Sequence, residues 1–314
     1  MYNEVPLEFQ TALALPADDD FARGEKLRAI CAQMKEAWKG SCARKIPVIP
    51  EKPIYTEYES LEEVKQLNSD GRYVPIGYDM VSADIYGIDL FKTYSYLVSG
   101  RAQTGKTNLL KALIRMTAAK NANVVVIEHG TSELAVTAER AKVIYINTVE
   151  QQAQFFAQMI TPFKERNAFK KELIQKEKDE SEIFEEMQVH KPYFIIVSDM
   201  VAFIKSVYIR EAGVPDISPF VENIAEKGKL HNIYFFFGIN PDTTSDVAVK
   251  KAYVGFTSYR TGIHLGGNIS STKFFDSTNF DFKEQSRIQK PGVGMLPMRN
   301  NENVKFVVLP FVKG

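Results

Sequence analysis

The stretch Tyr94–Ala112, YSYLVSGRAQTGKTNLLKA, decides the fold of this 314-residue chain. An apolar run ends at Val98, Gly100 follows it, and four residues separate this glycine from Gly105-Lys106-Thr107. Leucines at helical spacing begin directly afterwards, so the stretch predicts a strand, a glycine loop and a helix. The spacing G-x-x-x-x-G-K-[ST] lets successive backbone N–H groups face a phosphate at the N-terminus of that helix.

This loop supplies the candidate nucleotide-binding residues. They are Gly100, Arg101, Ala102, Gln103, Thr104, Gly105, Lys106, Thr107 and Asn108. Lys106 is expected to reach the outer phosphates of ATP, and the Thr107 hydroxyl is expected to ligate Mg²⁺. Arg101, Ala102 and Gln103 stand where small residues often help such a loop to close on phosphate. The alternative interpretation is a chance match of the pattern, and the strand–loop–helix context argues against it.

The composition is that of a globular protein without net charge. Lysine and arginine together number 39, and so do aspartate and glutamate, so the basic surplus usual in nucleic-acid-binding chains is missing. We therefore expect no nucleic-acid partner. The cysteines, Cys31 and Cys42, are too far apart for a C-x-x-C motif, no zinc constellation is visible, and free thiols suit a reducing cytosol. The apolar runs are too short to span a bilayer and no secretory signal is visible, so we expect a soluble chain.

Residues 1–70 are predicted to form a connector with helices that pack on the core, and residues 71–314 to form the main domain. A short extended segment is expected at 5–12, a helix at 21–38 capped by aspartates, an extended connector at 46–53, and a second short helix at 60–68. The first helix has one apolar stripe that we expect to be buried. Its members are Leu27, Ile30, Cys31, Met34 and Trp38.

Strands alternate with helices through the rest of the chain, which predicts a doubly wound α/β sheet. Two short strands around a polar turn are expected at 74–78 and 85–90, buried strands at 123–128, 142–146, 191–199 and 232–237, and a closing hairpin from 292 to 312. The longest helical region is expected at 150–189. The charged second half of this region favours a solvated face, and a lever that binds a partner is the alternative.

Asp199 and Met200 decide what the loop can do. Asp199 ends an apolar strand well downstream of the loop, so we expect it at the same edge of the sheet, holding Mg²⁺ together with Thr107. Met200 occupies the place where a hydrolysing enzyme of this architecture usually carries a glutamate base. A thioether cannot accept a proton, and loss of a positioned base lowers the rate by about 10²–10⁴-fold. No catalytic residue is assigned.

The strand at 232–237 also lacks a polar residue that such sites usually have. Such a strand normally ends in a side chain that senses the γ-phosphate, but Gly238 and Ile239 follow here. Asn240 remains a substitute.

The motifs together resemble the FtsK/SpoIIIE family of P-loop motor ATPases and, more narrowly, the C-terminal ATPase modules of the type VII secretion proteins EssC/EccC. The resemblance rests on VPIGYDMVSADIYGIDLFKTYSYLVSGRAQTGKTN, VVVIEHGTSELAV, KPYFIIVSDM, GKLHNIYFFFGINP and PGVGML, and it covers nearly the whole chain. It implies a RecA-like P-loop NTPase core with a mainly parallel central sheet flanked by helices, plus an N-terminal extension of helix and connector.

The resemblance also implies a function. It indicates a module within a longer membrane-anchored protein, on the cytoplasmic side, that binds ATP and Mg²⁺ weakly or structurally with impaired hydrolysis. Its partners would be the other ATPase modules of the same protein, in a hexamer, and small helical-hairpin secretion substrates. Arg260 aligns loosely with an arginine of the family, and we interpret it as a surface or structural residue.

Three other functions stay open. One is a competent motor whose base is Glu128 or Glu133. Another is a DNA translocase, which the charge balance disfavours. The last is a protein-binding module that has lost its nucleotide.

Overall fold

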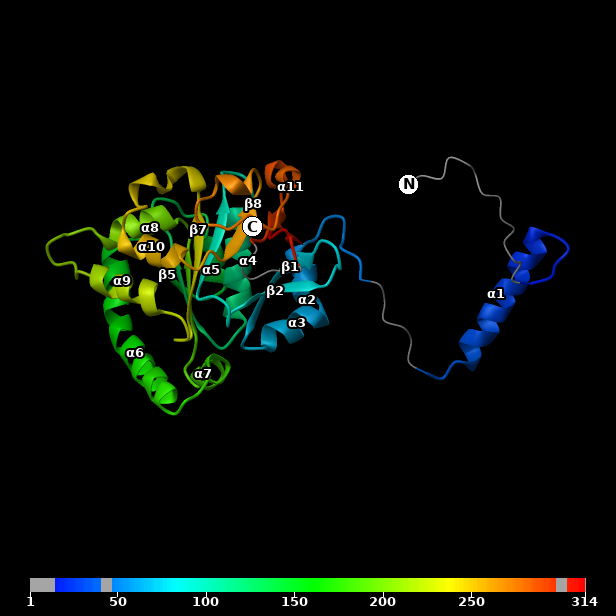
Figure 1. Cartoon of the computed structure of the whole chain (residues 1–314), viewed down its shortest axis with the longest axis horizontal. Helices are drawn as coiled ribbons and strands as arrows, with labels where there is room; N and C mark the ends of the chain where they lie inside the picture. The colour runs from blue at the N-terminus through cyan, green and yellow to red at the C-terminus, as the bar shows by residue number, and fades with distance from the viewer. Residues whose placement is uncertain (1–14, 41–46, 298–303, 314) are drawn as a thin grey trace. The chain divides into compact units, whose positions relative to one another are not determined.

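The computed structural model describes residues 15–40, 47–297 and 304–313 (Figure 1). The chain divides into two units, residues 1–46 and 47–314, and each is described by itself. The extended segment expected at 5–12 lies outside the described residues. No helix of the described part combines the length and the apolar character needed to cross a membrane.

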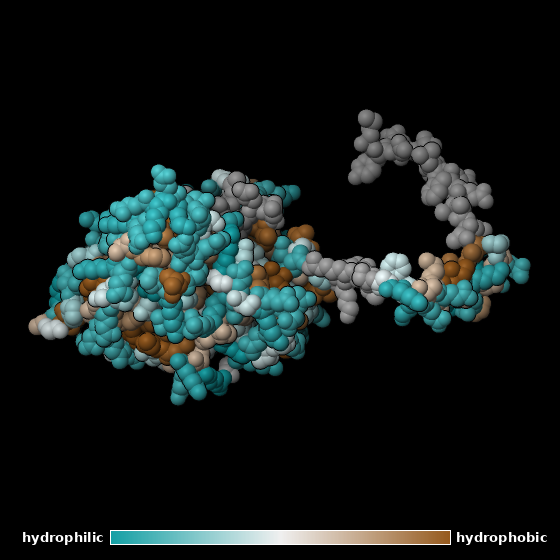
Figure 2. All heavy atoms as spheres, turned by 90° about the horizontal axis from the view of Figure 1, so that it is seen from below, coloured by the Kyte–Doolittle hydropathy of each residue, from teal (hydrophilic) through white to brown (hydrophobic). Residues whose placement is uncertain are grey.

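The first unit contains helix α1 (Asp20–Ala37). The Asp19 side chain caps it by accepting a hydrogen bond of 2.7 Å from the Ala22 N–H, which confirms the predicted aspartate cap. Within this unit α1 buries none of its residues and Trp38 is 65% exposed, and the packing of the apolar stripe on the core stays a prediction. Among the described residues of this unit there is no second element for the stripe to pack on. Figure 2 shows the resulting apolar surface in brown.

The second unit is built on one sheet of 10 strands in the order β2-β1-β10-β9-β8-β3-β7-β6-β4-β5. The strands are β1 (Tyr73–Asp79), β2 (Ile85–Asp89), β3 (Ser95–Gly100), β4 (Asn123–Ile127), β5 (Ile144–Ile146), β6 (Tyr193–Val197), β7 (Ile233–Ile239), β8 (Gly262–Leu265), β9 (Val293–Met295) and β10 (Phe306–Val308). In this order, the strands from β8 to β5 are all parallel to their neighbours. The strands from β2 to β9 pair antiparallel with one another, and β9 pairs antiparallel with β8. The predicted α/β architecture with a mainly parallel sheet is confirmed.

Helices cover this sheet (Figure 1). They are α2 (Tyr55–Ser60), α3 (Glu62–Ser69), α4 (Lys106–Ala118), α5 (Ala135–Arg140), α6 (Val149–Gln175), α7 (Glu180–Met187), α8 (Met200–Val207), α9 (Ser218–Lys227), α10 (Lys251–Thr257) and α11 (Phe282–Ser286), with the 3-10 helices η1 (Pro241–Asp246) and η2 (Ile269–Ser271). The alternation of β7 shows how the two faces are used. Phe235 and Phe237 contact Phe256 of α10, with ring centroids 4.7 and 4.8 Å apart, whereas a side chain at Gly238 would meet Leu110 of α4.

The antiparallel half joins both ends of the second unit. β1 pairs with β2 and β9 pairs with β10, so the predicted lead-in strands and closing hairpin are confirmed. Ile54 forms a bridge with Phe311, and Tyr55 and Tyr58 of α2 are buried. Residues 47–70, which the sequence analysis grouped with the connector, therefore contact the sheet as part of the same unit.

The region expected to be one long helix at 150–189 is divided. Glu177 has a left-handed backbone with φ of 59°, and a capping box at Asp179 starts α7. The predicted solvated face is wrong for α7, because Ile183, Phe184 and Met187 are buried. Most of the other residues in this segment are charged, so its composition suggested a solvated helix although three apolar residues form a buried face.

Candidate nucleotide and magnesium site

The loop between β3 and α4 requires its two glycines. A side chain at Gly100 would place Cβ 2.4 Å from the Thr104 hydroxyl oxygen and 2.6 Å from the Leu265 carbonyl oxygen. Gly105 has φ of 106°, in the left-handed region that favours glycine. Gly105 is also the N-cap of α4 and provides no side-chain cap, so the N-terminus of this helix is open to an anion.

A cavity of about 540 Å³ lies beside the loop. Its lining residues are Ala102, Gln103, Gly105, Lys106, Thr107, Leu110, Glu128, His129, Thr131, Glu133, Leu134, Ser198 and Asp199. The three segments that form it follow β3, β4 and β6, which are parallel and therefore end at the same edge of the sheet. The volume is within the range of small-molecule sites.

Five of the nine predicted loop residues line this cavity, and Gly100, Arg101, Thr104 and Asn108 do not. The Asn108 side chain is used elsewhere. It donates to the Pro310 carbonyl at 2.9 Å and accepts from the Val312 N–H at 2.7 Å, so it anchors the C-terminal segment.

The Lys106 ammonium is held by its own loop. Nζ donates to the carbonyl oxygens of Gly100 and Arg101 at 2.6 and 2.7 Å. Burial lowers the pKa of Lys106, and the nearby carboxylates of Asp199 and Glu133 act in the opposite direction. A phosphate that enters the cavity can bind this ammonium only by replacing these two carbonyl oxygens as its hydrogen-bond acceptors.

Thr107 contacts one carboxylate and shares the cavity with a second. Its hydroxyl donates to Glu133 Oε2 at 2.7 Å. Asp199 lines the same cavity, and its Oδ1 accepts the N–H groups of Val201 and Ala202 at 2.7 and 3.0 Å as the N-cap of α8. A hydroxyl and carboxylate oxygens are the hard ligands that Mg²⁺ prefers, so the residues present fit this ion.

Glu128 is a buried carboxylate at the end of β4, 1% exposed. It accepts four hydrogen bonds, from the Thr131 hydroxyl, the N–H groups of Glu133 and Leu134, and the Tyr145 hydroxyl, at 2.9 to 3.1 Å. Both oxygens are thus committed to the loop between β4 and α5. Glu128 shapes this loop and is not free to activate water.

Met200 does not face the cavity. It is the first residue of α8, it is 0% exposed, and it is not among the lining residues. Because Asp199 caps the helix, the chain turns there and directs residue 200 into the core. The position at which the sequence motif leads one to expect the catalytic base is therefore a core position in this chain.

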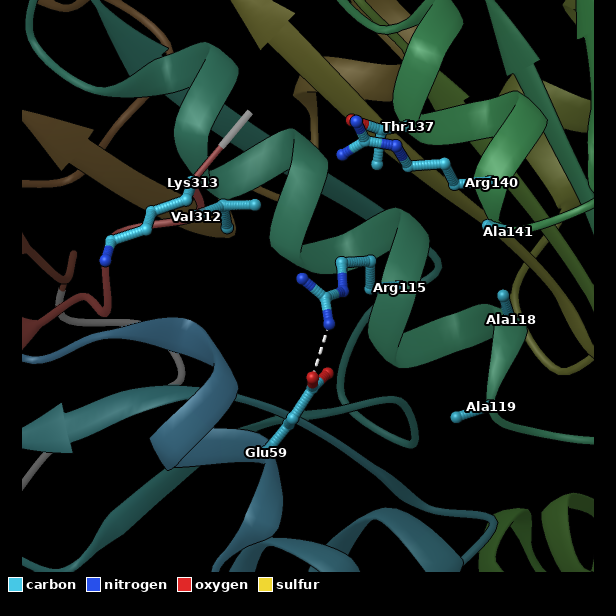
Figure 3. A pocket seen from close by; sticks show the side chains of 9 residues that line it. All are labelled: Glu59, Arg115, Ala118, Ala119, Thr137, Arg140, Ala141, Val312 and Lys313. Atoms are coloured by element: carbon cyan, nitrogen blue, oxygen red, sulfur yellow. Dashed lines mark hydrogen bonds and ion pairs between the residues drawn. The ribbon is translucent and has the colours of Figure 1, made fainter.

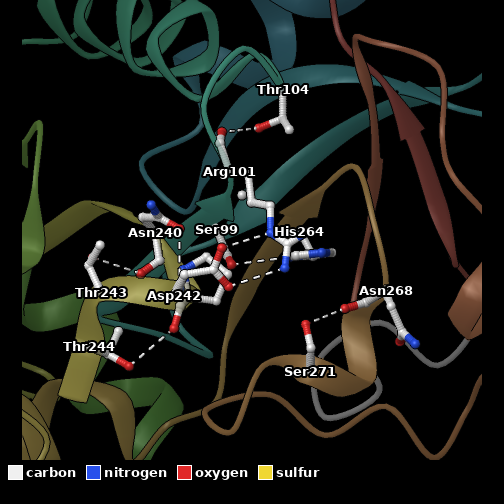
Figure 4. A network of polar contacts seen from close by, with 12 residues as sticks. Ser99, Arg101, Thr104, Asn240, Asp242, Thr243, Thr244, His264, Asn268 and Ser271 are labelled. Carbon is white, nitrogen blue, oxygen red and sulfur yellow. Dashed lines mark hydrogen bonds and ion pairs between the residues drawn. The ribbon is translucent and has the colours of Figure 1, made fainter.

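The end of β7 has no room for a sensor side chain. A Cβ on Gly238 would lie 2.2 Å from the Ser198 carbonyl oxygen, and Ile239 is buried. Asn240, the predicted substitute, accepts the Asp242 N–H at 3.2 Å and caps η1. Figure 4 shows this segment beside the phosphate loop, where Asp242 forms an ion pair of 2.8 Å with Arg101.

Sequence reasoning missed the pair formed by Ser99 and His264. The register of β3 and β8 places these residues side by side, and Ser99 Oγ lies 3.1 Å from His264 Nδ1 (Figure 4). Burial lowers the pKa of His264 to about 4, and the charges of Arg101 and Lys106 add to this. No sequence motif could have found the pair, because it depends on strand pairing.

Arg260 precedes β8, with a left-handed φ of 52°, and is exposed. β8 is parallel to β3, so its amino end lies at the opposite edge of the sheet from the phosphate loop. Arg260 is thus far from the cavity of its own chain.

A second cavity, of about 510 Å³, lies between α2, α4, α5 and the C-terminal segment (Figure 3). Arg115 pairs with Glu59 in its wall. It includes none of the predicted loop residues and is therefore not the candidate nucleotide site.

Comparison of the sequence with protein-family models and with curated proteins gave no match. Solved structures do match. The cytoplasmic domain of EssC superposes with a TM-score of 0.72 at 17% identity, covering 98% of this chain and 58% of that one. EssC ATPases 2 and 3 from Geobacillus thermodenitrificans match with a TM-score of 0.65 at 18% identity, covering 95% and 52%.

The pCW3 conjugation coupling protein TcpA, solved with ATPgS, matches with a TM-score of 0.59 at 14% identity, covering 91% of this chain and 82% of that one. The chain spans between half and three fifths of the two EssC structures. At such low identities the likeness is one of fold. The resemblance drawn from the motifs is confirmed at this level, and the chain has the RecA-like P-loop fold found in the cytoplasmic ATPase domains of EssC.

Proposed function

We propose that this chain is an ATPase module of an EssC/EccC-type secretion protein and that it binds Mg·ATP in the cavity beside the phosphate loop. The observation that carries the proposal is the joint lining of one cavity by Lys106, Thr107 and Asp199, below the open N-terminus of α4. The loop amides and Lys106 bind the phosphates, and Thr107 and Asp199 hold the metal. Mg²⁺ bound there would neutralise phosphate charge.

Hydrolysis by the module is impaired. Met200 faces the core, Glu128 is committed to four hydrogen bonds, and Gly238 leaves no space for a sensor. Neither Met200 nor Glu128 can therefore act as the base, and loss of a positioned base lowers the rate by about 10²–10⁴-fold. The nucleotide then serves mainly to hold the module in one conformation.

The module acts within a larger assembly. The EssC structures that share this fold are longer than the chain, which supports partners among other ATPase modules of the same protein. A hexamer, a position on the cytoplasmic side of a membrane-anchored protein, and export of small helical-hairpin proteins complete the proposal. The zero net charge supports a protein cargo over a nucleic acid.

Titration calorimetry with Mg·ATP, together with a turnover assay, tests the proposal. Wild type should bind, Lys106→Ala should bind at least about tenfold more weakly, and Lys111→Ala on the same helix should bind as wild type. Turnover should stay well below about 1 s⁻¹, which is the lower part of the ordinary enzyme range. Turnover at or above that rate, abolished by Lys106→Ala, would refute the impaired hydrolysis.

One observation favours a second candidate, a protein-binding module that has no nucleotide. The Lys106 ammonium already donates to two carbonyl oxygens of its own loop, those of Gly100 and Arg101. In this case calorimetry should record no Mg·ATP binding by wild type, and Lys106→Ala should leave the binding of protein partners unchanged.

A further inference from the structure

The loop between β4 and α5 brings one carboxylate to the hydroxyl that the phosphate loop offers to a metal. Glu133 is exposed, lines the cavity, and accepts the Thr107 hydroxyl at 2.7 Å. These residues are 26 positions apart in the sequence. They meet because β3 and β4 end at the same edge of the sheet.

We infer that Glu133 is a direct Mg²⁺ ligand, the second carboxylate of the site beside Asp199; the inference rests on the proposed nucleotide function. Mg²⁺ holds oxygen ligands at about 2.1 Å in an octahedron, so neighbouring ligand oxygens lie about 3.0 Å apart. The separation of 2.7 Å between Thr107 Oγ1 and Glu133 Oε2 is close to that edge. A metal can therefore bind both oxygens with little movement of either side chain.

Asp199 alone would be a poor anchor for the ion. Its Oδ1 already accepts the two N–H groups of Val201 and Ala202, which leaves Oδ2 for a metal. Glu133 supplies a second carboxylate to the lining of the same cavity. Two carboxylates and one hydroxyl match the hard-oxygen preference of Mg²⁺ and of Mn²⁺.

Glu128 holds this ligand in place. It accepts the N–H groups of Glu133 and Leu134 and the hydroxyl of Thr131, and it is buried. The backbone that carries Glu133 is thus fixed before a metal arrives. Preorganisation of this kind strengthens a metal site because the ligand loses little further freedom on binding.

Two alternatives assign other roles to Glu133. As a latch, it would only occupy the Thr107 hydroxyl of the empty site, and its removal would strengthen nucleotide binding. As a base, it would leave the affinity for metal unchanged and affect turnover only. Removal of a metal ligand weakens metal binding, removal of a latch strengthens nucleotide binding, and removal of a base changes neither affinity. Binding measurements therefore separate the three roles.

The experiment uses the full chain as wild type, Glu133→Gln and the control Glu139→Gln, which neutralises an exposed carboxylate on α5. Mn²⁺ binding without nucleotide is followed by electron paramagnetic resonance. ATP affinity is measured by calorimetry in Mg²⁺ and in excess EDTA. Thermal unfolding midpoints verify that all three chains fold alike.

We expect Glu133→Gln to weaken Mn²⁺ binding by about tenfold or more, and to reduce the gain in ATP affinity that Mg²⁺ confers by about the same factor. Its ATP affinity in EDTA should not fall, and Glu139→Gln should match wild type. Unchanged Mn²⁺ affinity in Glu133→Gln would overturn the inference, and so would tighter binding of Mg·ATP.

The same measurements distinguish a failure of the proposed nucleotide function from a failure of the metal assignment. If wild type binds ATP in neither condition, yet binds Mn²⁺ in a manner that requires Glu133, the metal site stands and the nucleotide function is wrong. If wild type binds Mg·ATP and Glu133→Gln matches it in every measurement, the metal assignment alone is wrong.

Discussion

Placing a glutamate at position 200 should not create an ATPase. The sequence suggests Met200→Glu as a repair of the missing base, but the side chain at this position is 0% exposed and does not line the cavity. The new carboxyl would enter the core instead of reaching a water beside the phosphate. We expect no gain in turnover and a large loss of stability.

The loss follows from the pKa of a buried carboxyl. Burial raises the pKa of such a glutamate to about 8, compared with about 4.3 in the unfolded chain. At pH 7.5 the unfolded chain has released a proton that the folded chain keeps, which costs about 1.36 kcal/mol for each pH unit above 4.3, or about 4 kcal/mol. Because folding then takes up a proton, stability rises as the pH falls, and pH 5.5 should recover about 2.5 kcal/mol.

Met200→Gln is the matched control, because it has the same size and no charge. Urea unfolding of both variants at pH 7.5 and 5.5 isolates the ionisation cost as the difference between them. We expect the gap to be about 4 kcal/mol at pH 7.5 and about 1.5 kcal/mol at pH 5.5. A Met200→Glu protein as stable as Met200→Gln at pH 7.5, or one that hydrolyses ATP about tenfold faster than wild type, would show that residue 200 reaches the cavity.

Three further predictions concern the neighbours of the site. Gly238→Asn should destabilise the protein by about 3 kcal/mol or more in urea unfolding and restore no sensor, because its Cβ would lie 2.2 Å from the Ser198 carbonyl oxygen. Glu128→Ala should cost about 3 kcal/mol in the same assay, since four donors lose their acceptor; a loss below about 1 kcal/mol would contradict the proposed role. Burial lowers the pKa of both His231 and His264 to about 4, so the unfolded chain takes up protons that the folded chain refuses between about pH 6.5 and 4. Stability should therefore fall with decreasing pH across this window by up to about 3 kcal/mol per histidine, and His231→Gln should flatten the fall, as measured by urea midpoints at half-unit pH steps.

Local features of the fold were readable from the sequence. The spacing of Gly100, Gly105 and Lys106 predicted the strand, the loop and the helix, because each depends on the backbone preferences of a few successive residues. The apolar run before Asp199 likewise predicted a buried strand with an acid at its end. Parallel strands that follow one another through helices end at a common edge, so the sequence also predicted that Asp199 would lie near the loop.

Only the tertiary structure decided which side chains share the cavity. Met200 and Asp199 are adjacent in the chain, yet one faces the core and the other the cavity, because the helix cap at Asp199 sets the direction of the first turn. Glu128 and Glu133 are both glutamates that follow the same strand, and the sequence does not distinguish their roles. In the folded loop Glu128 accepts the backbone N–H of Glu133, whereas the Glu133 carboxylate contacts the Thr107 hydroxyl. The physical reason is that local spacing determines backbone conformation, whereas the surroundings of a side chain depend on strands and helices that are distant in the chain.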